Sequence, residues 1–187
     1  MAFDTLIKHG TIIDGTGKLR YDADLGITGG RIAAIGKLEK VEAGQVIDAS
    51  GLVVSPGFID MHSHSDVTLL DDPCGDSKAH QGVTTEVSGN CGYSPFPIGK
   101  AGSEGATDPD MVSRYPWVWS DLDGWAKTME SKGIGLNVAP QVGHSAVRAA
   151  VGLREDRRPT EDEIKEMRRL VTESVEQGAF SLSTGLT

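Results

Sequence analysis

Residues 57–66 read Gly57-Phe58-Ile59-Asp60-Met61-His62-Ser63-His64-Ser65-Asp66, an apolar run that ends in two histidines spaced two residues apart. Side chains of a β-strand alternate between its two faces, so a strand over residues 58–64 projects His62 and His64 from the same face. Two neighbouring imidazoles at a strand end can bind one metal ion, and active sites of α/β barrels lie at strand ends of this kind. The alternative is a pair of unrelated surface histidines, because short His-x-His matches arise by chance.

The composition is that of an ordinary globular protein. The chain has 187 residues, of which 38% are hydrophobic, and a formal net charge of −9. It contains no apolar run near the roughly 18 residues that span a bilayer, and no basic segment followed by a signal-peptide core. The acidic balance and the lack of basic clusters exclude nucleic acid as the main partner, and we expect no membrane partner. Two cysteines, Cys74 and Cys91, are too few for a disulfide scaffold, which favours a cytoplasmic location.

Residues 1–55 read as a domain of short strands separated by glycine-bearing turns. Strands of this length and spacing predict a small sheet or sandwich. About 50 residues bury too little apolar surface for a good core, so we expect this segment to depend on another part of the protein. The predicted strands are residues 5–7, 11–13, 24–27, 31–35 and 46–48.

Residues 56–187 alternate strands with helices, which predicts parallel pairing with right-handed crossovers. The clearest helix follows Thr160, which forms a capping box with Glu163 and is followed by apolar residues at helical spacing up to a C-terminal glycine, Gly178. Four such strands form either a small open sheet or half of an eight-stranded barrel, and the end of the chain directly after a strand favours the half-barrel. The predicted strands are residues 58–64, 83–88, 136–142 and 179–183, and the other predicted helices are residues 121–131 and 146–153.

Cys91 lies between Asn90 and Gly92, directly after the second predicted strand. This position places its thiol at the same rim as the two histidines, where a thiolate can bind one metal or bridge two. The alternative is a small buried hydrophobic residue, which is the usual state of a free cysteine. The metal interpretation is the stronger one, because His62 and His64 lie at the end of the neighbouring predicted strand.

Other polar residues near this rim have more than one reading. Asp60 shares the face of His62 and either orients an imidazole or forms a salt bridge. His144 closes the third predicted strand and either orients a ligand, contacts substrate or is structural. We assign no role in the site to Cys74, His80 or His9. Trp117 and Trp119 either pack the long loop or line a pocket.

Several of these segments resemble the amidohydrolase superfamily, and the D-aminoacylase branch (N-acyl-D-amino-acid deacylases) in particular. The superfamily resemblance rests on residues 14–17, 24–35 and 57–64, and the branch resemblance on residues 81–94, 116–120, 142–145 and 178–186. It covers essentially the whole chain, and Asn90-Cys91-Gly92 is its most specific element. Sister branches such as dihydroorotases and hydantoinases place a carboxylated lysine as the bridging ligand.

The resemblance implies a (β/α)8 barrel and a small β-sandwich built from both chain ends. It implies one or two zinc ions held by His62, His64 and Cys91, with Cys91 able to bridge, and leaves Asp60, Asn90 and His144 as supporting or substrate-contacting candidates. Two further histidines and a catalytic aspartate are expected from later strands, outside this chain. The implied reaction is hydrolysis of small N-acyl-D-amino acids.

Three other possibilities remain open from the sequence. The first is a cyclic-amide hydrolase of the dihydropyrimidinase kind. The second is an inactive fragment, or half of a split protein, that needs a chain supplying the later strands or that self-associates. The third is a non-catalytic metal-binding module, which is disfavoured because three ligands at an open rim suit catalysis better than a closed structural site.

Overall fold

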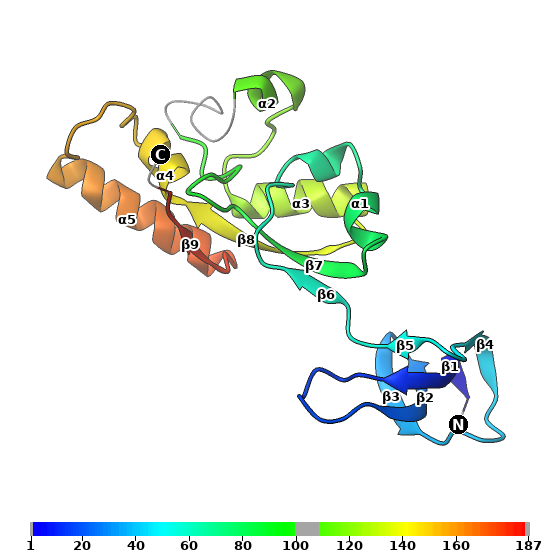
Figure 1. The fold of residues 1–187 in the computed structure, drawn as a ribbon. Coiled ribbons are helices and arrows are strands. Elements are labelled where there is room, and N and C mark those ends of the chain that lie inside the picture. Colours follow the sequence, from blue (N-terminus) through cyan, green and yellow to red (C-terminus); the bar gives the residue numbers. More distant parts are fainter. Residues whose placement is uncertain (1, 100–108, 186–187) are drawn as a thin grey trace. The chain divides into compact units, whose positions relative to one another are not determined.

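The computed structural model describes residues 2–99 and 109–185 (Figure 1). The chain divides into two compact units, Met1–Pro56 and Gly57–Thr187. The first unit is one five-stranded sheet in the order β3-β2-β1-β4, with β5 also paired to β1. Its strands are β1 (Phe3–Ile12), β2 (Tyr21–Thr28), β3 (Arg31–Gly36), β4 (Ala43–Asp48) and β5 (Val53–Val54).

The first two predicted strands, residues 5–7 and 11–13, are wrong as separate elements, because residues 5–7 and 11–12 belong to one strand, β1, which ends at Ile12. The pairing of β1 with β2 shifts register between Ile7 and Gly10, and His9 has a positive φ of 60°. A bulge of this kind inserts an extra residue and bends the strand without ending it. The amide of His9 donates to the Asp24 carboxylate (2.9 Å), which stabilises the bulge.

The second unit is built on a four-stranded parallel sheet in the order β6-β7-β8-β9 (Figure 1). The strands are β6 (Phe58–Asp60), β7 (Val83–Ser88), β8 (Asn137–Gly143) and β9 (Ser181–Ser183). The four strands were all predicted, and β7 has the predicted bounds. Strand β9 is two residues shorter than expected.

Strand β6 is also shorter than predicted, because it ends at Asp60 and leaves His62 and His64 in the segment that follows. Two contacts explain the early end. The Asp60 side chain accepts the His62 amide (3.1 Å), and the Ser63 amide donates to the carbonyl of Val87 (3.0 Å). The backbone therefore leaves regular strand geometry while remaining attached to β7.

Helices connect the strands, and α1 contacts β7 while α4 and α5 contact β8. Helix α5 begins after Thr160 and has the predicted capping box, in which the Glu163 amide donates to the Thr160 hydroxyl and the Glu163 carboxylate accepts the Thr160 amide. The helices are η1 (a 3₁₀ helix, Thr68–Leu70), α1 (Asp76–Ala79), α2 (Pro109–Arg114), α3 (Leu122–Lys132), α4 (His144–Ala150) and α5 (Glu161–Glu176).

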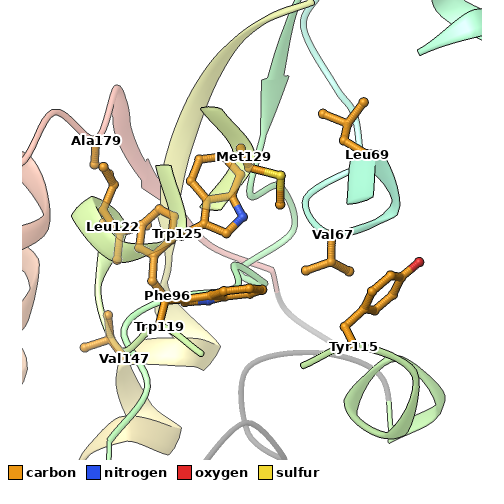
Figure 2. Close-up of a cluster of buried hydrophobic side chains, with 11 residues drawn as sticks. Val67, Leu69, Phe96, Tyr115, Trp119, Leu122, Trp125, Met129, Val147 and Ala179 are labelled. Carbon is orange, nitrogen blue, oxygen red and sulfur yellow. The ribbon is translucent and has the colours of Figure 1, made fainter. Parts of the chain in front are cut away.

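Aromatic and aliphatic side chains together form the core of the second unit (Figure 2). Phe96 packs against Trp125 with ring centroids 5.6 Å apart, and Trp119 donates its indole N–H to the carbonyl of Pro95. Trp117 packs on Trp119, so both tryptophans of the long loop serve packing. The indole of Trp125 also donates to the carbonyl of Asp66 (2.9 Å), which ties the core to the segment that carries the histidines. Within the described part of the chain, no helix is long and apolar enough to cross a membrane.

Candidate metal centre

Three side chains that can bind a metal converge after the carboxyl ends of β6 and β7. One donor atom from each of His62, His64 and Cys91 lies within 4.8 Å of the others. The Cys91 Sγ is 3.3 Å from the His62 Nε2, and the two imidazole rings have centroids 5.3 Å apart. Both histidines are exposed and Cys91 is half-buried, so the cluster is open to solvent. The structure thus brings together the three predicted ligands.

Asp60 fixes the backbone of the histidine segment, and its contacts do not include an imidazole. Its carboxylate accepts the His62 amide and forms an ion pair with the Lys78 ammonium of α1. The hydrogen bond from Lys78, assisted by that from the His62 amide, lowers the pKa of the Asp60 carboxyl. The structure therefore realises the salt-bridge alternative for Asp60 and gives no support for direct orientation of an imidazole.

Cys91 occupies a turn whose backbone is left-handed at three positions. The φ angles of Gly89, Cys91 and Gly92 are 75°, 56° and 83°. A Cβ at Gly89 would lie 2.2 Å from the carbonyl oxygen of Gln141, so only glycine fits there. Cys91 is not a glycine, and a left-handed conformation costs a residue with a Cβ about 1–3 kcal/mol. Strain of this kind concentrates at functional sites.

The hydroxyl of Ser183 joins the two ends of this turn. It donates to the carbonyl of Gly89 (2.5 Å) and accepts the amide of Gly92 (3.1 Å). Because Ser183 lies in β9, the turn that carries Cys91 is attached to a strand two positions away in the sheet. The side chain of Cys91 is consequently presented by a turn that is held at both ends.

Asn90 and His144 lie in different surroundings. Asn90 is buried, and its amide group bonds to the carbonyls of Ser63 and Val87 and to the side chain of Gln141. His144 is the first residue of α4 and lines an apolar groove of about 500 Å³ between α4 and α5. Asn90 thus connects the segment of the two histidines to the segment of Cys91, whereas His144 is outside the three-residue cluster.

Two acids beside the histidines, the buried Glu86 and the half-buried Asp66, were not singled out from the sequence. Glu86 is fully buried and accepts hydrogen bonds from the hydroxyls of Ser63 (3.1 Å) and Ser65. Burial, with a smaller contribution from the charge of Glu86, raises the pKa of Asp66 to about 7. The sequence offered a signal for Glu86, because it is a carboxylate inside the β-branched run of residues 83–88, where an unpaired charge is costly to bury.

Comparison with known proteins gives a consistent family. The model of the amidohydrolase family matches residues 45–186. D-aminoacylase of Alcaligenes xylosoxydans xylosoxydans is 42% identical over 184 residues, which are 98% of this chain and 38% of the relative. N-acyl-D-glutamate deacylase of the same organism is 38% identical over 183 residues, with 98% of this chain and 37% of the relative covered. The chain thus spans about two fifths of the length of these relatives.

Solved structures agree with the sequence matches. N-acyl-D-glutamate deacylase from Bordetella bronchiseptica, in complex with zinc and a phosphonate inhibitor, has a TM-score of 0.89 and 39% identity, and covers 100% of this chain and 39% of its own. A D-aminoacylase structure has a TM-score of 0.85 and 39% identity, and covers 98% of this chain and 38% of its own. These matches confirm the expected fold, a small β-domain segment followed by the first half of a (β/α)8 barrel. The chain belongs to the amidohydrolase family.

Proposed function

We propose that this chain carries part of the active site of a zinc-dependent enzyme that hydrolyses the amide bond of N-acyl-D-amino acids, releasing a carboxylate and a D-amino acid. The observation that carries the proposal is the convergence of His62, His64 and Cys91 after two adjacent parallel strands. Supporting it, two relatives that match 98% of the chain are a D-aminoacylase and an N-acyl-D-glutamate deacylase.

The three donors fit zinc in type and in spacing. Imidazole nitrogen and thiolate sulfur are the ligands that zinc prefers, and bond lengths of about 2.0 and 2.3 Å put two such donors roughly 3.5 Å apart in a tetrahedral site. The observed separation of Cys91 Sγ and His62 Nε2 is 3.3 Å. A related D-aminoacylase has a binuclear metal centre, and we propose that His62, His64 and Cys91 hold one or two zinc ions here, with Cys91 able to bridge if two are bound.

The chain's own residues would hold and present the metal. The chemistry that zinc supplies at such a site is a water of lowered pKa and a polarised carbonyl group. Asp60 and Lys78 hold the backbone of His62, and Ser183 holds the turn of Cys91. Glu86 is buried and already accepts two serine hydroxyls, and Asp66 is half-buried, so we propose that the proton-transferring aspartate comes from a part of the enzyme beyond these residues.

The deacylase reaction is favoured over hydrolysis of a cyclic amide. The match to a Bacillus subtilis dihydroorotase covers 60% of this chain, compared with 98% for the deacylases, and an Arthrobacter aurescens hydantoinase at 21% identity shows the fold alone.

We also propose that the 187-residue chain by itself is inactive and needs the later strands, in the same or in a partner chain. Both cysteines are free thiols, which supports a cytoplasmic location.

The test is a deacylation assay on the chain mixed with the part of a D-aminoacylase that lies beyond the matched region. We expect zinc-dependent release of a D-amino acid from its N-acetyl form, and no release from the L-form or opening of a hydantoin ring. The variant Cys91→Ala should abolish the reaction, whereas Cys74→Ala is the matched control and should retain it. Ring opening of hydantoin, or equal rates for the two cysteine variants, would refute the proposal.

A further inference from the structure

A chain of side-chain hydrogen bonds crosses the sheet of the second unit behind the three donors. The Ser181 hydroxyl donates to the Gln141 side-chain oxygen (2.6 Å), and the Gln141 amide nitrogen donates to the side-chain oxygen of Asn90 (2.8 Å). The Asn90 amide nitrogen donates in turn to the backbone carbonyl of Ser63 (3.1 Å). We call Ser181, Gln141 and Asn90 the amide relay. It connects β9 and β8 to the two segments that follow β7 and β6.

The amide relay ends at the segments that carry the three donors. Ser63 separates His62 from His64, and Asn90 directly precedes Cys91. The Asn90 amide therefore bonds one ligand-bearing segment to the other, and its second N–H donates to the carbonyl of Val87 (2.8 Å). This contact sets the distance between the cysteine and the histidine pair.

The orientation of the Asn90 amide depends on Gln141. Both N–H groups of Asn90 face backbone carbonyls, so its oxygen has to face a donor, and Gln141 supplies that donor. A reversed Asn90 amide would place its oxygen against two carbonyl oxygens. Ser181 orients Gln141 in the same way, because its hydroxyl donates to the Gln141 oxygen and leaves the nitrogen directed at Asn90.

We propose that Gln141 is a positioning residue for the metal centre, and that Ser181 supports it from the next strand. The proposal rests on the proposed function, since it concerns the zinc ligands His62, His64 and Cys91. Removal of the Gln141 donor leaves the buried Asn90 oxygen without a partner and releases the contact between the ligand segments. Loss of partners behind metal ligands typically lowers metal affinity 10–100-fold.

The chain offers a matched control on the same strand. Asn137, at the other end of β8, also carries an amide side chain that donates to a backbone carbonyl of β7, that of Thr84 (3.0 Å). Gln141→Met and Asn137→Leu each replace an amide by an apolar group of similar size. Each variant removes one hydrogen bond that an amide side chain of β8 donates to β7 or to the turn after it, but only Gln141 reaches the donor segments.

The experiment is a cobalt(II) titration of the full 187-residue chain, followed by the thiolate-to-cobalt charge-transfer absorption. We expect Gln141→Met to weaken cobalt binding about 10-fold and to lower the absorption per bound cobalt, with Asn137→Leu binding like the unmodified chain. Equal cobalt affinity and equal absorption in Gln141→Met and Asn137→Leu would overturn the role of Gln141. If Gln141 had a purely structural role, both variants would have a lower denaturant midpoint, and their cobalt affinity and absorption per bound cobalt would be unchanged.

Ser181→Ala keeps the proposal testable if Gln141→Met does not fold. It removes one hydroxyl at the outer end of the relay, and it should weaken cobalt binding in the same direction by a smaller factor. Unchanged cobalt binding in Ser181→Ala would count against the relay. Absence of the charge-transfer band in the unmodified chain would instead overturn the zinc site itself, so the two failures are distinguishable.

Discussion

Cys91 combines a functional thiol with an unfavourable backbone. Its φ of 56° lies in the left-handed region, which glycine adopts readily and residues with a Cβ do not. The neighbouring glycines and the Ser183 hydroxyl hold the turn in this conformation. The conformation directs the thiol at His62, so the chain tolerates local strain in return for the position of one donor.

Replacing Cys91 by glycine should stabilise the metal-free chain relative to replacement by alanine. Both variants lose the thiol, but only alanine keeps the Cβ that the left-handed conformation disfavours. After allowance for the greater flexibility of glycine in the unfolded chain, we expect Cys91→Gly to be more stable by about 1 kcal/mol. Urea unfolding in the presence of a chelator measures the difference. A glycine variant less stable than the alanine variant would show that the turn is not strained at Cys91.

The predictable residues of the site were those whose position follows from strand periodicity. The spacing of His62 and His64 and the place of Cys91 after the next strand were enough to predict that the three side chains meet. The contacts of Asp60 and Glu86 could not be predicted from strand periodicity. Asp60 bonds to Lys78 of α1 and Glu86 to the serines around His64, and both partners are set by tertiary packing.

At the scale of the elements, helix α5 was the most predictable because its signals are local. Thr160 and Glu163 form the capping box that the sequence indicates, and Arg157 adds two hydrogen bonds to the Glu163 carboxylate (2.6 and 2.9 Å). The bounds of β1 and β6 were not predictable in this way. The bulge at His9 and the capture of the His62 amide by Asp60 depend on contacts that leave no periodic pattern.

The cap of α5 should weaken in acid. The hydrogen bonds from Arg157, with that from the Thr160 amide, lower the pKa of Glu163 from 4.5 to about 2. Because the folded-state pKa is the lower one, the stabilising contribution is complete above pH 4.5 and is lost as the pH falls towards 2. Urea midpoints across this range should show Glu163→Gln less stable than the unmodified chain at pH 7, with the gap closing in acid. A gap independent of pH would contradict the assigned contacts.

At the scale of the whole molecule, β6 and β9 are the edge strands of the second unit's sheet among the described residues, and both carry apolar side chains. Ile59 of β6 is 59% exposed and Leu182 of β9 is 47% exposed, and Phe180 beside β9 is 63% exposed. Edge strands with exposed apolar residues tend to pair with other chains. The sheet therefore has surfaces through which the chain can associate.

We expect the isolated 187-residue chain to associate with itself in a concentration-dependent way. The variant Leu182→Lys places a charge at the β9 edge and should reduce the association. Leu19→Lys is the matched control, because Leu19 is 92% exposed but lies outside both sheets, between β1 and β2. Sedimentation velocity measures the effect, and a monodisperse monomer of the unmodified chain at all concentrations would contradict the expectation.

X-ray absorption at the zinc edge tests the metal centre most directly. The zinc-loaded chain should show nitrogen ligands at about 2.0 Å and a sulfur ligand at about 2.3 Å, supplied by His62, His64 and Cys91. The sulfur ligand should be absent from Cys91→Ala and present in Cys74→Ala. A zinc site without sulfur in the unmodified chain, or one that keeps its sulfur in Cys91→Ala, would contradict the assignment.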